Sequence, residues 1–453
     1  MLAFGEFHLD SAVAWSALMT SAAVQPLSFE AGMTREERSN LILAFTRVLY
    51  LNGESTQLTA ITAQRLGQCL GLRATIFLHW GELQVQIEDA AGRFISSMEA
   101  APTGVDMDRV ASTLRAVDEL CDGRLAPANA MKAIGRIAET PPTPTWLFAL
   151  AAGVCAVALA VLFGVQRLPA AALIFGSAAA GAVLRRALAH YSTNLFLQPC
   201  SAALVAGIVG ALAVRFQISS SLRLVAVSPC MVLVPGPHFI NGMLDLIRGR
   251  ISLGAARLIY AVLIVVAIST GLLLGLALFG VSLPVDPAAR TLPLWHDVIA
   301  AGLAAGCYSI FFSNPRKMLA WPVAVGTAAH ALRWVALTLL GAGAPIGALV
   351  ACLIVGITLA PVSRRWHMPF AAIGFASVVS MIPGVLMFRM ASGLTQLAST
   401  SQPTGALMEA TLADGWLAGL TILAMSLGLV VPKLLMDYVS EKRPSAQHKA
   451  RKK

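Results

Sequence analysis

A proline–glycine segment with polar neighbours stands inside an apolar part of the sequence. Its chemically distinctive residues are Pro235, Gly236, Pro237, His238, Asn241 and Asp245. The last three follow one another at steps of three and four residues, so they share one face of a helix. Proline frees a backbone carbonyl and glycine adds conformational freedom. Freed carbonyls suit an ammonium group and helix N-termini suit a carboxylate, so we predict that this segment binds a small zwitterion.

A second pair, Pro383-Gly384, lies 148 residues after the first, and Arg185 and Arg333 share that offset. Lipid tolerates broken helices only where protein or a water-filled cavity satisfies the freed backbone groups. Matched breaks in two halves are typical of transporters with a central site. We therefore include Arg389, near the end of the second broken span, among the predicted substrate-binding or gating residues. The alternatives are that both pairs only kink helices for packing, and that Arg389 only snorkels.

Two residues of the first segment have roles that the sequence leaves open. His238 could carry a proton, because histidine titrates near neutral pH, or it could be an interfacial residue. Asp245 could gate the site or form a loop ion pair with Arg248 and Arg250. Farther along, His330 is expected to make a hydrogen bond between helices. Three acids are expected to cap the starts of helices: Asp297, Glu409 and Asp414.

No spacing in the chain indicates a metal, a cofactor or a disulfide. The seven cysteines include no CxxC pair, so neither a zinc site nor a disulfide framework is predicted. The sequence has no Walker A or GxGxxG motif, which argues against ATP-driven transport by this chain alone. Ser55 or Thr56 ahead of a helix is typical of a cap, and no third partner completes a hydrolytic triad. The chain is therefore predicted not to be an enzyme.

The elements that position the proline–glycine pairs are predicted to be membrane helices. Of the 453 residues, 57% are hydrophobic and 12% are charged, against about 25% charged in soluble domains. A helix needs about 20 mostly apolar residues to cross a bilayer. We predict two halves of five spans, at 145–280 and 296–436, and the odd number per half inverts the second repeat. The ten spans are 146–165, 168–187, 196–215, 222–242, 256–280, 296–313, 318–339, 344–362, 369–389 and 411–436.

A small soluble α+β domain is predicted at 36–140, after an N-terminal extension at 1–35. Helical periodicity at 36–51 and three alternating β-rich runs between residues 73 and 98 indicate this domain. The fold class is therefore an all-α polytopic membrane protein of about ten helices in two inverted repeats, with an α+β domain at its N-terminus.

Lys and Arg in the short loops predict the orientation in the membrane. One side collects the basic tail at 437–453 and most of the loop cations, namely Arg185, Arg186, Arg248, Arg250, Arg257, Arg316, Lys317, Arg364 and Arg365. That side is predicted to be cytoplasmic, and ten spans then place both termini there, in a bacterial inner membrane. A net charge of +10 spread over such loops indicates contact with anionic lipid rather than with nucleic acid.

Several blocks of the sequence form a recognisable pattern. They are the run Leu-Tyr-Leu-Asn-Gly-Glu-Ser-Thr at 49–56, the Pro-Gly break at 233–237, Asn, Asp and Gly in order at 241–249, and Gly-x-x-Arg at 254–257. Together with Ile382-Pro383-Gly384, these blocks resemble the threonine/serine exporter family over about residues 37–436. The resemblance implies a secondary exporter of L-threonine and L-serine, driven by the proton motive force, with a cytoplasmic N-terminal domain. The chain departs from the family pattern at Gln57, where an Arg is usual.

Three functions are therefore distinguished. The first is a proton-coupled antiporter that exports small polar amino acids, with the amino acid, the proton and the lipid bilayer as its partners. The second is an exporter of dicarboxylates such as succinate, which would need a fixed positive charge near the membrane midplane, and only Arg333 and Arg389 are candidates. The third is a membrane-anchored hydrolase that acts through the N-terminal domain. Self-association is left open.

Overall fold

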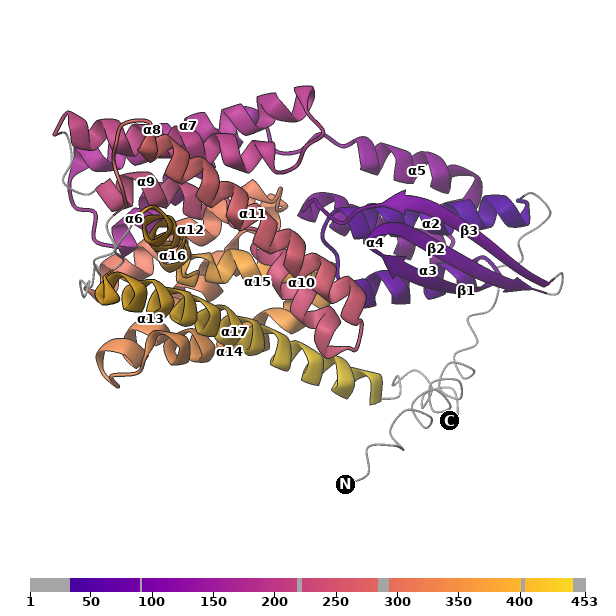
Figure 1. Ribbon diagram of the computed structural model, residues 1–453. Helices are drawn as coiled ribbons and strands as arrows, with labels where there is room; N and C mark the ends of the chain where they lie inside the picture. Colours follow the sequence, from indigo (N-terminus) through magenta and orange to yellow (C-terminus); the bar gives the residue numbers. More distant parts are fainter. Residues whose placement is uncertain (1–32, 90–91, 218–221, 284–292, 401–403, 443–453) are drawn as a thin grey trace, which may run out of the picture.

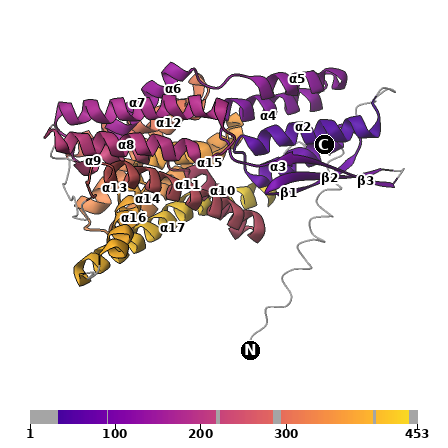
Figure 2. The same cartoon turned by 45° about the horizontal axis from the view of Figure 1, so that its top comes forward.

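The computed structural model describes residues 33–89, 92–217, 222–283, 293–400 and 404–442. A small α+β domain lies at one end of a long helical bundle, as Figures 1 and 2 show from two directions. We call the ends of the bundle helices beside this domain the domain end and the opposite ends the far end. Most of the predicted extension at 1–35 and of the predicted tail at 437–453 lies outside the described residues.

Local sequence signals begin the helices of the soluble domain. Thr34 and Glu37 form a capping box at the start of the first described helix. Ser55 caps the helix that begins at Thr56, and Asp106 caps the helix that begins at Met107; each side chain accepts a backbone hydrogen bond. The predicted β-rich runs form one antiparallel sheet in the order β1-β2-β3, and helices α2 and α3 pack on it. The elements are α2 (Arg35–Leu51), α3 (Thr56–Cys69), β1 (Arg73–His79), β2 (Gly81–Asp89), β3 (Gly92–Ala100), α4 (Met107–Cys121) and α5 (Pro127–Glu139).

One prediction for this domain is wrong: Cys69 and Cys121 form a disulfide. The two residues end α3 and α4, and their Cα atoms are 5.4 Å apart. A separation of 52 residues in the sequence carries no sign of this proximity, because it arises only when the two helices pack side by side. The other five cysteines are free thiols.

The helical bundle contains the predicted spans. Seven helices are long and apolar enough to cross a membrane, and two bent helix pairs raise this number to nine among the described residues. The predicted span that this number leaves out is 318–339, which corresponds to α13; that helix has 19 residues but carries His330 and Arg333. The helices are α6 (Thr145–Leu162), α7 (Leu168–Tyr191), α8 (Leu197–Arg215), α9 (Leu222–Met231), α10 (Gly236–Ile247), α11 (Ile251–Ala277), α12 (Leu294–Phe311), α13 (Ala320–Thr338), α14 (Ala344–Trp366), α15 (Phe370–Val378), α16 (Gly384–Ser399) and α17 (Gly405–Lys442).

Both proline–glycine pairs break a helix. The chain bends by 52° between α9 and α10, and by 68° between α15 and α16. Pro235 and Pro383 stand immediately before the second helix of each pair, where the missing proline N–H costs no helical hydrogen bond. The first residues of α8, α9 and α10 lie 147 or 148 residues before those of α14, α15 and α16.

The two breaks meet inside the bundle in a reciprocal way. Gly236, at the start of α10, lies against the ring of Phe375 in α15, and Gly384, at the start of α16, lies against Met231 in α9. Each break therefore packs on the helix that leads into the other break. Their close approach depends on the missing side chain of each glycine.

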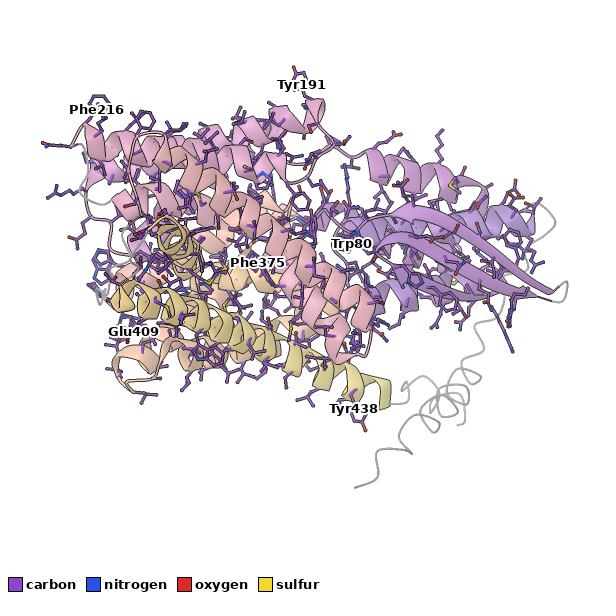
Figure 3. All side chains as sticks on the ribbon, in the orientation of Figure 1. Trp80, Tyr191, Phe216, Phe375, Glu409 and Tyr438 are labelled. Atoms are coloured by element: carbon purple, nitrogen blue, oxygen red, sulfur yellow. A yellow bond between two sulfur atoms is a disulfide. The ribbon has the colours of Figure 1, made fainter. Side chains whose placement is uncertain are left out.

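Exposed aromatic residues mark both ends of the bundle (Figure 3). Tyr191 and Tyr438 lie at the domain end and Phe216 lies at the far end, and all three are largely exposed. Such residues are typical of the two membrane–water interfaces. The chain is a multi-pass membrane protein.

Candidate functional site

The polar face of α10 is covered by the soluble domain. His238, Asn241 and Asp245 all lie in α10 and are buried, and their steps of three and four residues place them on one face of that helix. The Asn241 side-chain amide donates to the carbonyl of Gly53 at 3.1 Å, and the Thr56 hydroxyl donates to Asp245 Oδ2 at 2.9 Å. This face, which the sequence suggested for a central cavity, therefore lies in the seam between the two parts of the molecule.

His238 also lies in this seam. Its ring packs edge-on against Tyr260 of α11, with the ring centroids 5.1 Å apart, and Tyr260 in turn contacts Trp80 of the soluble domain. His238 therefore contributes to the contact between the bundle and the soluble domain in this conformation.

Arg257 neutralises the buried carboxylate of Asp245. Its side chain is fully buried, its Nε lies 3.1 Å from Asp245 Oδ2, and its guanidinium lies over the Tyr50 ring at 5.4 Å. Arg250 approaches the other carboxylate oxygen at 3.5 Å. Buried charges are tolerated when they are paired in this way. Asp245, Arg257 and Tyr50 therefore form one polar cluster across the seam.

The cavity at the two breaks is apolar and small. Its volume is about 30 Å³, comparable to the roughly 30 Å³ that one water occupies in the liquid. It is lined by Gly236, Phe239, Phe375 and Pro383, among other residues. The carbonyl of Val232, freed by the first break, accepts a hydrogen bond from the Tyr308 hydroxyl at 2.5 Å. The predicted ammonium site therefore has too little room for an amino acid in this conformation.

A larger cavity of about 840 Å³ extends from the breaks toward the far end. It lies between α11, α16 and α17. Phe239, Met387 and Ile422 line both this cavity and the small cavity at the breaks. Its walls are mostly apolar, with Ser392, Gln396 and a few other polar residues among them. The breaks thus lie at the inner end of this cavity, and the soluble domain covers them on the side of the domain end.

Arg389 and Asp414 form a second buried ion pair, and two expectations for them are wrong. Arg389 Nε lies 2.9 Å from Asp414 Oδ2, and both side chains are about 8% exposed. Arg389 therefore does not snorkel, and Asp414 does not cap a helix start, because it lies well inside α17. The pair joins α16 to α17 as the pair of Asp245 and Arg257 joins α10 to α11.

His330 makes the helix–helix hydrogen bond that was predicted for it. Its Nδ1 lies 2.7 Å from Asp297 Oδ2, so α12 and α13 are joined by a buried polar contact. Asp297 stands in the first turn of α12 but makes no side-chain cap hydrogen bond. The half-buried Arg333 lies near this pair.

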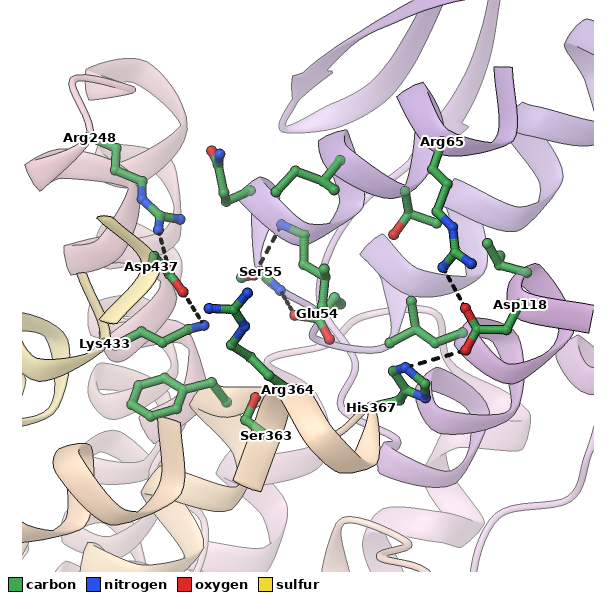
Figure 4. Close-up of a pocket in the computed structure, with 17 residues that line it drawn as sticks. Glu54, Ser55, Arg65, Asp118, Arg248, Ser363, Arg364, His367, Lys433 and Asp437 are labelled. Carbon is green, nitrogen blue, oxygen red and sulfur yellow. Dashed lines mark hydrogen bonds and ion pairs between the residues drawn. The ribbon is translucent and has the colours of Figure 1, made fainter. Parts of the chain in front are cut away.

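A polar pocket of about 270 Å³ lies in the seam, between the soluble domain and the domain end of the bundle. Figure 4 shows this seam pocket, which α3 and α4 bound on one side and the ends of α10, α14 and α17 on the other. Arg248 and Lys433 both pair with Asp437 at 2.8 Å. His367 lies 3.4 Å from Asp118 on the opposite wall.

Glu54 is the most deeply buried acid of the seam pocket, and no pattern in the sequence indicated a role for it. One carboxylate oxygen accepts a hydrogen bond from the Ser55 backbone at 2.6 Å, whereas Oε2 has no hydrogen-bond partner. Burial raises the pKa of Glu54 from 4.5 to about 7. Ser55 caps α3, as predicted. The signal that was missed is a carboxylate directly before that cap.

Comparisons with known proteins agree with this architecture. Residues 40–279 match the family model described as "Putative threonine/serine exporter", and residues 297–435 match the one described as "Threonine/Serine exporter, ThrE". A protein of Mycobacterium tuberculosis described as "Probable threonine/serine exporter" is 24% identical over 424 residues, which cover 87% of this chain and 76% of the relative. No solved structure matches the chain. Because the first family model alone spans more than half of the chain, the protein belongs to the threonine/serine exporter family.

Proposed function

We propose that the chain exports L-threonine, L-serine or similar small polar amino acids from the cytoplasm, in exchange for protons. The observation that carries this proposal is the reciprocal packing of the two broken helices. A buried ion pair also joins each broken helix to the helix that follows it in the chain. Broken helices at the meeting point of two related halves are typical of secondary transporters. In this proposal the substrate passes between Pro235-Gly236 and Pro383-Gly384.

The proposed mechanism is alternating access between two inverted halves. The described conformation covers the domain side of the breaks with the seam contacts, while the 840 Å³ cavity reaches the breaks from the far end. Rocking of one half against the other would close the far-side cavity and separate the seam. His238, Asn241 and Asp245 would then be uncovered toward the domain end.

The amino-acid substrate is favoured over a dicarboxylate by the ion pairs. A dicarboxylate needs fixed positive charge near the midplane, but Arg389 is paired with Asp414, and Arg333 lies near Asp297. A zwitterion carries no net charge and needs no such excess. A catalytic role for the soluble domain is not supported, because its Ser55 serves as a helix cap.

The substrate is tested by uptake into inverted membrane vesicles. Radiolabelled L-threonine, L-serine and succinate are compared with and without an imposed proton gradient. We expect gradient-dependent uptake of threonine or serine, which a protonophore abolishes, and a loss of more than tenfold in Pro235→Ala at normal membrane insertion. Uptake of succinate alone would overturn the substrate, and normal uptake by Pro235→Ala would overturn the role of the breaks. Vesicles from cells without the protein provide the background.

The proposed orientation places the soluble domain, with its disulfide, in the cytoplasm. The short-loop cations at the domain end support this orientation, but a reducing cytosol keeps cysteine pairs as thiols. The two sulfur atoms are placed to form the disulfide, but we expect the bond to form only outside a reducing cytosol, so that both residues are thiols in intact cells. In a variant without the other five cysteines, a membrane-permeant maleimide should label the partly exposed Cys121 without prior reduction, and an impermeant one should not. A pair that reacts only after reduction would favour the opposite orientation.

A further inference from the structure

The seam pocket has features of a ligand site that the transport mechanism above does not use. Its volume of about 270 Å³ lies just below the roughly 300–1,000 Å³ of drug-sized pockets, which suits a small metabolite. It contains a carboxylate that is 1% exposed and has one oxygen without a hydrogen-bond partner, on Glu54. A buried polar atom without a partner is costly, so a ligand cation at this oxygen would remove that cost.

Cationic side chains supply the opposite charge on the bundle side. Lys433 lies close enough to Glu54 to oppose the rise of its pKa, and Figure 4 shows Arg364 pointing from the end of α14 into the pocket. The charged and titratable groups of the pocket besides Glu54 are Arg65, Asp118, Arg248, Arg364, His367, Lys433 and Asp437. Asp118 on the soluble-domain wall is paired with Arg65 of the same wall and with His367 from the end of α14, so the cationic excess lies on the bundle side.

We propose that the seam pocket binds the zwitterion of a small α-amino acid before export, with its ammonium group on Glu54 and its carboxylate on Arg364 and Lys433. Leu58, Leu114 and Phe370 form an apolar part of the wall, which leaves room for a short side chain only. This inference rests on the proposed function, and it adds an entry site at the mouth that the soluble domain covers.

The protonation of Glu54 makes this binding dependent on pH. An ammonium group pairs only with the ionised carboxylate, whereas at a pH below about 7 burial keeps Glu54 protonated. Affinity should therefore rise as the pH increases through 7 and level off above it. Loading of the substrate would release a proton from Glu54 on the domain side.

Binding of L-threonine to the purified full chain in detergent, measured by calorimetry, tests the proposal. We expect Glu54→Gln to weaken binding at pH 8 at least tenfold and to remove the rise in affinity between pH 6 and 8. The matched control is Glu82→Gln, which neutralises an exposed acid of the same domain. Arg364→Gln attacks the opposite wall and should also weaken binding at least tenfold, so the proposal stays testable if Glu54→Gln fails to fold.

Two analogues assign the charges. In 2,3-dihydroxybutyrate a hydroxyl replaces the ammonium group of threonine, and in threonine amide a neutral carboxamide replaces the carboxylate. The wild type should reject both, whereas Glu54→Gln should lose its preference for threonine over 2,3-dihydroxybutyrate. Unchanged binding in Glu54→Gln and Arg364→Gln, with export intact, would overturn the seam site alone. If wild-type vesicles transport neither threonine nor serine and neither binds, the proposed function fails together with this inference.

Discussion

Arg257→Ala is expected to lower the free energy of unfolding by about 3–5 kcal/mol, the usual cost of removing one partner of a buried ion pair, and to abolish export. Asp245 would remain 2% exposed with the Thr56 hydroxyl and the more distant Arg250 as its partners. The Tyr50 ring would also lose the guanidinium that lies over it. Thermal unfolding in detergent measures the stability, and uptake into inverted vesicles measures export.

Two further variants separate the charge from the packing. Arg257→Met combined with Asp245→Asn removes both charges at similar volume, and it should recover most of the lost stability but not the export. Arg93→Ala is the control, because its pair with Glu88 is 65% and 43% exposed and such pairs contribute about 0–1 kcal/mol. A loss of stability in Arg257→Ala no larger than that in Arg93→Ala would show that the polar cluster of Asp245, Arg257 and Tyr50 does not stabilise the protein.

Much of the fold could be predicted because it follows local rules. Long apolar segments, the capping residues Ser55 and Asp106, and the alternation of the strands are all readable within a short window. The two breaks were readable only from proline and glycine together, because proline alone lies inside the continuous helices α14 and α17, at Pro361 and Pro432. These signals are sufficient for the fold class and for the position of the breaks along the chain.

The site could be predicted only in part because its partners come from distant segments. The sequence placed Asp245 beside Arg248 and Arg250, but the residue that neutralises it in the interior is Arg257 of the next helix. It offered no reason to connect Tyr308 with the Val232 carbonyl, or Cys69 with Cys121. Such contacts depend on how helices pack, which no local pattern encodes.

The contacts of the soluble domain with the bundle could not be predicted either. The run around Gly53 and Thr56 was readable as the start of a helix, and it is one. That its carbonyl and hydroxyl would bind Asn241 and Asp245, almost 190 residues away, was not. The seam pocket forms, and Glu54 is buried in it, only because the two parts of the chain meet there.

Gly236→Ala is expected to abolish export and to destabilise the protein at the upper end of the about 1–3 kcal/mol that overpacking costs, or beyond it. A Cβ at this position would stand 1.4 Å from Cε2 of Phe375, so the ring has to leave its place. That ring is 3% exposed and packs edge-on against Tyr308, with the centroids 5.4 Å apart. Vesicle uptake and thermal unfolding of the insertion-competent variant measure both effects.

Gly384→Ala is the matched control at the equivalent position of the second break. Its Cβ would meet Met231 Cγ at 2.9 Å, a much smaller overlap than the one with Phe375, so stability and export should both fall less than in Gly236→Ala. The double variant Gly236→Ala with Phe375→Leu makes room for the methyl group and should regain part of both stability and export. If Phe375→Leu restores neither, the break requires the backbone freedom of glycine itself. If Gly236→Ala exports normally, close contact between the two breaks is not part of the transport mechanism.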